Sequence, residues 1–78
     1  MAVKAYLLIE TDAGEEKGVL KELLKLNNVK SAESVTGPYD VIARVEAGTI
    51  DKLGAVVLGK IQSIRGIRRT TTCLGVKV

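Results

Sequence analysis

The sequence contains no histidine, tryptophan or phenylalanine, and its single cysteine is Cys73. One cysteine cannot form an internal disulfide bond, and without histidine we expect no dedicated zinc or copper site. The same lack leaves Cys73 without the usual base that activates a thiol for nucleophilic catalysis. We therefore predict a protein that is not an enzyme and that has no catalytic residue, metal or cofactor.

Long hydrophobic runs are also lacking. The apolar run at residues 6–9 is too short for the core of a secretory signal and far too short for a membrane span. We expect a cytoplasmic protein without a membrane partner. The net charge of +3 permits an acidic partner but does not require one.

The 78 residues allow one domain with a modest core. A core of this size supplies only roughly 3–5 kcal/mol of stability, so small domains often gain stability from partners. Hydrophobic residues make up 46% of the chain although aromatic residues make up only 3%. This surplus of aliphatic side chains indicates a subunit interface, and we expect a homo-oligomer.

Hydrophobic periodicity predicts four strands and two helices. Alternation indicates the strands, and apolar residues at helical spacing indicate the helices. In chain order the predictions are a strand over 3–10, a helix over 14–26, strands over 29–36 and 41–47, a helix over 50–63 and a strand over 67–78. The second strand is polar and is expected near an edge of the sheet.

Polar residues predict the helix ends. Asp12 and Glu15 have the spacing of a capping box, and Thr49 can cap the second helix. The pair Asn27-Asn28 can adopt the left-handed conformation that stops a helix. Residues predicted on the apolar face of the second helix are Ile50, Leu53, Val57, Ile61 and Ile64.

The order βαββαβ predicts an α+β protein of the ferredoxin-like class, with an antiparallel four-stranded sheet. Right-handed crossovers place both helices on one face of this sheet. Tyr6, Leu8 and Ile42 then lie on the other face, which no helix covers. A second copy of the sheet is the natural cover.

The run Gly37-Pro38-Tyr39-Asp40 predicts a chain reversal between the second and third strands. In the last strand, Thr70 and Thr72 share a face because they are two residues apart. Hydroxyls, turn amides and one carboxylate suit a zwitterion. Asp40 could accept from an ammonium group, while the hydroxyls and amides donate to a carboxylate.

These two segments, VTGPYDV at 35–41 and GIRRTTT at 66–72, resemble the effector-binding domain of the Lrp/AsnC family of transcriptional regulators. That module is called the RAM domain, for regulation of amino-acid metabolism. The family pattern is a Gly-x-Tyr-Asp turn followed by a Gly-Val-x-x-Thr-x-Thr strand, and here Ile67 replaces the valine. The resemblance covers nearly the whole chain, so we expect a single RAM domain over residues 1–78 without a helix-turn-helix domain.

The resemblance implies a function and a site. Family domains pair through their sheets as a dimeric α/β barrel, and the dimers assemble into octameric or decameric rings. An amino acid effector binds in the crevice between dimers, which here would be lined by Gly37, Tyr39, Asp40, Thr70 and Thr72. The chain is then expected to be a non-enzymatic, oligomeric amino acid sensor linked to the regulation of amino-acid metabolism. Full-length Lrp/AsnC regulators are a further expected partner, through co-assembly.

Three alternatives remain open. The first is an assembly module without a ligand. The second is a nucleic-acid-binding module that uses Arg65, Arg68 and Arg69, although the chain lacks the strand aromatics on which such sheets stack bases. Because a helix-turn-helix is also lacking, we expect no direct sequence-specific nucleic-acid binding. The third is an oxygenase of the dimeric α/β-barrel type, whose sites commonly use histidine, tryptophan or asparagine; this chain has neither of the first two.

Overall fold

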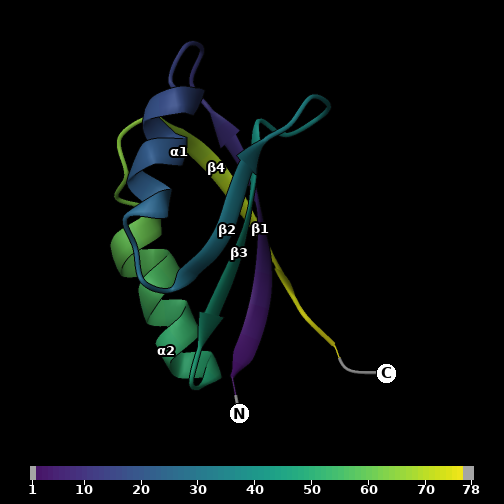
Figure 1. Cartoon of the computed structure of the whole chain (residues 1–78), viewed down its shortest axis with the longest axis vertical. Coiled ribbons are helices and arrows are strands. Elements are labelled where there is room, and N and C mark those ends of the chain that lie inside the picture. Colours follow the sequence, from purple (N-terminus) through teal and green to yellow (C-terminus); the bar gives the residue numbers. More distant parts are fainter. Residues whose placement is uncertain (1, 77–78) are drawn as a thin grey trace.

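A computed structural model describes residues 2–76, which form one sheet with its helices on one side (Figure 1). The order of elements is βαββαβ, with the second helix continuing as a π-helix. The elements are β1 (Val3–Thr11), α1 (Glu16–Leu24), β2 (Val29–Ser34), β3 (Val41–Ala47), α2 (Ile50–Ala55), η1 (Val56–Ile61) and β4 (Ile67–Leu74). Within this described part, no helix combines the length and the apolar character that a membrane crossing requires.

The sheet has four strands in the order β2-β3-β1-β4, and its neighbouring strands are antiparallel. The predicted ferredoxin-like class is therefore confirmed, as is the position of β2 at an edge. The bounds of β3 agree with the prediction, whereas β2 ends at Ser34 rather than at residue 36. The predicted end of the last strand, at residue 78, lies outside the described residues.

The hydrophobic core lies between the sheet and the helices. Alternate residues of β1 and β3 point into it, and Leu7, Ile9 and Val41 are fully buried. The helices contribute Val19 and Leu23 from α1, both fully buried. Fully burying one such aliphatic side chain stabilises a protein by roughly 1.5–3 kcal/mol. The other members of the core are Ala5, Val29, Ala43, Val45, Ala47, Leu53, Val56, Val57 and Ile61.

The opposite face of the sheet carries no helix, and we call it the open face. As predicted, it carries Tyr6, Leu8 and Ile42. Leu8 lies directly opposite Ile42 in the register of β1 and β3, and Tyr6 lies opposite Arg44. Leu8 and Ile42 are half-buried, while Tyr6 is 40% exposed.

The capping box predicted at Asp12 and Glu15 is wrong. Helix α1 begins at Glu16, and the residue at its N-cap, Glu15, makes no side-chain capping bond. The amide of Asp12 instead donates to the carbonyl of Gly66 at 2.8 Å. Asp12 therefore ties β1 to the turn before β4, a long-range contact that competes with local capping.

The left-handed stop predicted at Asn27-Asn28 is also wrong. Among the described residues, only glycines have a positive φ, and α1 already ends at Leu24. The side-chain amide of Asn28 donates to the carbonyl of Glu46 at 2.9 Å. This contact to β3 fixes the start of β2.

In the second helix, the predicted cap is confirmed and one predicted core residue is not. The hydroxyl of Thr49 accepts from the amide of Lys52 at 3.1 Å. Ile50, expected on the apolar face, is 62% exposed. A π-helix holds more residues per turn than an α-helix. Leu53, Val57 and Ile61, each four residues apart, lie in the core, whereas Ile50 is the first residue of α2 and lies before the π-helix.

Candidate functional site

The turn between β2 and β3 holds three of the predicted site residues, Gly37, Tyr39 and Asp40. The amide of Val35 donates to the carbonyl of Asp40 at 3.0 Å and closes the loop. Gly37 has a φ of 136°, a conformation that side chains with a Cβ rarely adopt. Gly37 is exposed, while Tyr39 and Asp40 are half-buried.

Asp40 joins this turn to the end of β1. Its amide donates to the carbonyl of Ile9 at 2.9 Å, and its Oδ2 accepts from the amide of Thr11 at 2.8 Å. The carboxylate therefore continues the hydrogen bonding of β1 beyond the last paired residue of β3, Val41. Asp40 has a structural role, and it stabilises β1 rather than its own turn.

Thr70 and Thr72 lie on β4, on the other side of β1. Thr70 is opposite Ile9 and Thr72 is opposite Leu7, so the two threonines share a face, as predicted. Because Ile9 and Leu7 point into the core, this is the helix side of the sheet. β4 is an edge strand, and along it Thr70 is half-buried and Thr72 is exposed.

The structure brings Asp40 and Thr70 to the same end of the sheet. Both flank Ile9, Asp40 from the residue before β3 and Thr70 from β4. Because β3 and β4 lie on either side of β1, two strand spacings separate them, about 10 Å. None of the three surface hollows that we describe is lined by Gly37, Tyr39 or Asp40. One chain therefore does not enclose all five predicted residues in one pocket.

Sequence reasoning missed Gln62, which follows the last residue of η1. Its Nε2 donates to the hydroxyl oxygen of Thr70 at 3.1 Å. Gln62 and Thr70 also line a hollow of about 300 Å³, which we call the β4 hollow. Its lining residues are Gln62, Ile67, Arg68, Arg69 and Thr70. No local pattern marks Gln62, because the path of the chain between η1 and β4 brings it to Thr70, eight residues further on.

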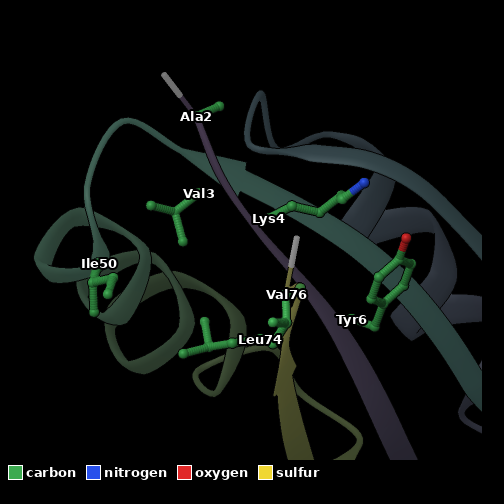
Figure 2. A pocket seen from close by; sticks show the side chains of 8 residues that line it. Ala2, Val3, Lys4, Tyr6, Ile50, Leu74 and Val76 are labelled. Atoms are coloured by element: carbon green, nitrogen blue, oxygen red, sulfur yellow. The ribbon is translucent and has the colours of Figure 1, made fainter. Parts of the chain in front are cut away.

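A second hollow, of about 720 Å³, lies at the other end of the sheet. Figure 2 shows Val3, Ile50 and Leu74 on one side of β1 and Lys4 and Tyr6 on the other. Within residues 2–76 its lining is mostly aliphatic and includes no carboxylate. This hollow therefore lacks the group that would hold an ammonium ion.

A third hollow, of about 600 Å³, runs between α1 and the end of η1. Its lining mixes both charges, with Glu15 and Glu22 among four basic residues. The basic residues are Lys21, Lys25, Lys60 and Arg65. Among the described residues, no group of three potential metal ligands lies close enough together to hold an ion.

The order βαββαβ with both helices on one face defines a ferredoxin-like α+β domain, and comparison with known proteins identifies its family. The family model described as the Lrp/AsnC ligand binding domain matches residues 4–77. The chain therefore belongs to the Lrp/AsnC ligand-binding domain family.

Relatives and solved structures agree. An uncharacterized HTH-type transcriptional regulator of Pyrococcus abyssi is 31% identical over 72 residues, which cover 92% of this chain and 46% of that protein. The chain spans about half the length of the curated relatives it matches. The crystal structure of FFRP-DM1 superposes with a TM-score of 0.91 at 36% identity, covering 95% of this chain and 99% of that chain. Escherichia coli AsnC gives a TM-score of 0.91 at 30% identity, covering 97% and 52%.

Proposed function

We propose that this chain is the effector-sensing module of a transcriptional regulator and that its effector is an amino acid. In this proposal it catalyses no reaction, and it links amino-acid levels to gene regulation through its oligomeric state. The family supports a ligand-binding role, and the curated relatives are named as HTH-type transcriptional regulators. The amino acid itself is argued from the side chains at one end of the sheet.

The placement of Asp40 and Thr70 on either side of Ile9 carries the proposal. A carboxylate has about four acceptor positions, so the one bond from Thr11 leaves Asp40 able to bind an ammonium group. Thr70 accepts from Gln62, so its hydroxyl hydrogen can donate to a carboxylate. Thr72 extends this row of hydroxyls, and Tyr39 would set the shape of the crevice.

The spacing of these groups favours a site that is shared between subunits. The ammonium and carboxylate groups of an amino acid are attached to the same carbon, whereas Asp40 and Thr70 lie on strands about 10 Å apart. None of the hollows described above is lined by both residues. Asp40 with the turn of one subunit and Thr70 of a neighbour would together complete the crevice.

The open face supplies the means of assembly. Leu8 and Ile42 form an apolar pair at its centre, and charged residues surround them. The Nε of Arg44 is buried without a hydrogen-bond partner in the described part of the chain, and the nearest oxygen of Glu46 is 3.8 Å away. A second sheet packed here would cover the apolar pair and could offer Arg44 an acceptor. Rings of eight or ten subunits would extend this dimer.

Calorimetric titration with the common amino acids tests the proposal. L-methionine belongs in the set because a Neisseria meningitidis regulator of the same fold is described as a complex with L-Met. At 17% identity that likeness concerns the fold alone. We expect at least one amino acid to bind the wild-type chain.

Two substitutions separate the ligand role of Asp40 from its structural role. Asp40→Asn keeps an acceptor for the amide of Thr11 but removes the charge, so affinity should fall while stability is kept. Asp40→Ala should lower both, with a loss of about 1.5–3 kcal/mol of binding free energy. If no amino acid binds at millimolar concentration, only the assembly role remains.

The nucleic-acid alternative rests on Arg65, Arg68 and Arg69, which are exposed and form no ion pair within residues 2–76. Fluorescence anisotropy at about 150 mM salt tests it, because phosphate contacts give affinities that fall steeply with salt. We expect no sequence-dependent binding at submicromolar concentration. Such binding would favour the alternative over the amino acid sensor.

A further inference from the structure

The β4 hollow combines donors from two elements without any acidic side chain. The guanidinium groups of Arg68 and Arg69, the amide of Gln62 and the hydroxyl of Thr70 belong to its lining residues. The other lining residue is Ile67. A site with positive charge, several N–H and O–H donors and no carboxylate suits an anion.

A β-bulge presents Arg68 at this hollow. In the register of β1 and β4, Glu10 pairs with Arg69 and Thr11 pairs with Ile67, so Arg68 is left without a partner residue. Bulges bend a strand and redirect its side chains, and they are common beside functional sites. Arg68 is exposed, and its side chain is not used by the β1–β4 ladder.

The charges near the hollow leave Arg68 as the main cation. Glu10 lies opposite Arg69 in the register of β1 and β4, so Arg69 has a carboxylate residue as its cross-strand neighbour. The two ion pairs found among residues 2–76 are Glu22 with Lys25 and Glu46 with Arg44, and neither involves the β4 hollow. A bidentate guanidinium contact to a carboxylate is therefore available at Arg68.

The bond between Gln62 and Thr70 sets the direction of the Thr70 hydroxyl. Because the amide Nε2 donates, the hydroxyl oxygen acts as the acceptor and its hydrogen can donate outward. Gln62 thereby turns Thr70 into a donor for an anion without touching the ligand. It acts as a positioning residue.

We propose that the β4 hollow is a subsite for a second carboxylate, so that the module binds dicarboxylic ligands, acidic amino acids first among them. The proposal rests on the function proposed above and names the class of ligand. One carboxylate would lie against Thr70 and the other against Arg68. A hollow of about 300 Å³ is at the lower end of ligand pockets, which favours a small acid over a polymer.

Paired titrations test this subsite. L-glutamate and L-aspartate are compared with L-glutamine and L-asparagine, which have the same shape without the second charge. We expect the acids to bind about tenfold or more tightly than the amides, as for a hydrogen bond to a charged group. Glutarate, which lacks the ammonium group, is titrated in parallel. It should bind the wild-type chain, and Arg68→Gln should weaken this binding.

Matched variants assign the effect to the hollow. Arg68→Gln should weaken binding of the acids far more than binding of the amides, and so remove most of the preference. Arg65→Gln is the control, because Arg65 is equally exposed but lines the hollow between the helices. Gln62→Glu should also reduce the preference, since a carboxylate only accepts and would bind the Thr70 hydrogen. Gln62→Met should cause a smaller loss because it adds no charge.

The outcomes separate the subsite from the proposed function. If amino acids bind but acids and amides bind equally, and Arg68→Gln changes nothing, the subsite is overturned and the sensor function stands. If glutarate binds through Arg68 but no amino acid binds, the subsite is supported and the amino acid sensor is overturned. Binding of a labelled nucleic acid through Arg68, with no binding of any small acid, would overturn the subsite.

Discussion

The two faces of the sheet are built from the same strands, yet their alternate residues meet different surroundings. On the helix side, Leu7 and Ile9 are fully buried by the chain's own helices. On the open face, Leu8 is half-buried and Tyr6 is 40% exposed. Because the side-chain period of a strand is two, each strand serves two purposes. One set of residues folds the chain, and the other is available for a second copy.

The compositions of the faces follow this division. In β1 and β3 the helix side is aliphatic apart from Thr11, whereas the open face mixes aliphatic residues with charges. A small apolar centre with a polar surround is typical of protein interfaces. The charged residues of the open face in these strands are Lys4, Glu10, Arg44 and Glu46.

The largest expected difference between the faces comes from truncating adjacent leucines. Leu7→Ala should lower the free energy of unfolding by about 2–5 kcal/mol, because it leaves a cavity in a closed core. Leu8→Ala should cost less in dilute solution, and its cost should grow with protein concentration because in the proposed assembly Leu8 contacts a second copy. Urea denaturation of both variants at two protein concentrations measures this. If both variants lost the same free energy of unfolding at both concentrations, the two faces would not differ in the way proposed.

Two glycines with positive φ, Gly66 and Gly37, allow a turn packed against α1 to be compared with an open one. Gly66, at φ 98°, lies beneath α1, and a Cβ there would be 2.8 Å from the Cβ of Glu15. Gly37, at φ 136°, has open space around the same position. Gly66→Ala adds a steric clash to backbone strain, so it should cost more than Gly37→Ala, by about 1–3 kcal/mol. Thermal unfolding of both variants measures this difference. Equal losses of stability would mean that α1 can move away from the new Cβ at position 66 without cost.

The helix starts provide a smaller test. Thr49→Ala removes the hydroxyl that accepts from Lys52 and should cost about 1 kcal/mol. Asp12→Ala removes a side chain that makes no cap and should change stability by less than about 0.5 kcal/mol. Equilibrium denaturation compares the two. A larger loss of stability in Asp12→Ala than in Thr49→Ala would indicate that Asp12 does cap α1.

The smallest effect is expected on the outer surface of α1. The hydrogen bond from Lys25, with its charge, lowers the pKa of Glu22 below its ordinary value. A lowered pKa means that the pair stabilises the fold above the unfolded pKa of Glu22, and that this is lost as pH falls through the folded pKa. Both side chains are exposed, so only an NMR titration should detect it. In Lys25→Met the pKa of Glu22 should rise, and an unchanged value would rule out this cause.

Much of the fold could be predicted because alternation and helical spacing are local. The bounds of β3, the order of elements and the face holding Leu8 and Ile42 all follow from the period of apolar residues. The ends of α1 could not, because Asp12 and Asn28 use their polar groups for contacts to the distant residues Gly66 and Glu46.

The candidate site was only partly predictable. The turn residues and the shared face of Thr70 and Thr72 follow from spacing. The role of Asp40 toward Thr11 depends on β1 and β3 becoming neighbours, and that of Gln62 toward Thr70 depends on how the chain turns between η1 and β4. Strand order also separates Asp40 from Thr70 by the width of β1, which the motif spacing does not reveal.

The mass of the wild-type chain in solution tests the central claim, that the open face is an interface between copies. Light scattering at micromolar concentration should return at least twice the chain mass of 8.3 kDa. Leu8→Lys, which would bury an unpaired charge between the sheets, should reduce that mass. A wild-type mass of 8.3 kDa under these conditions would contradict the account.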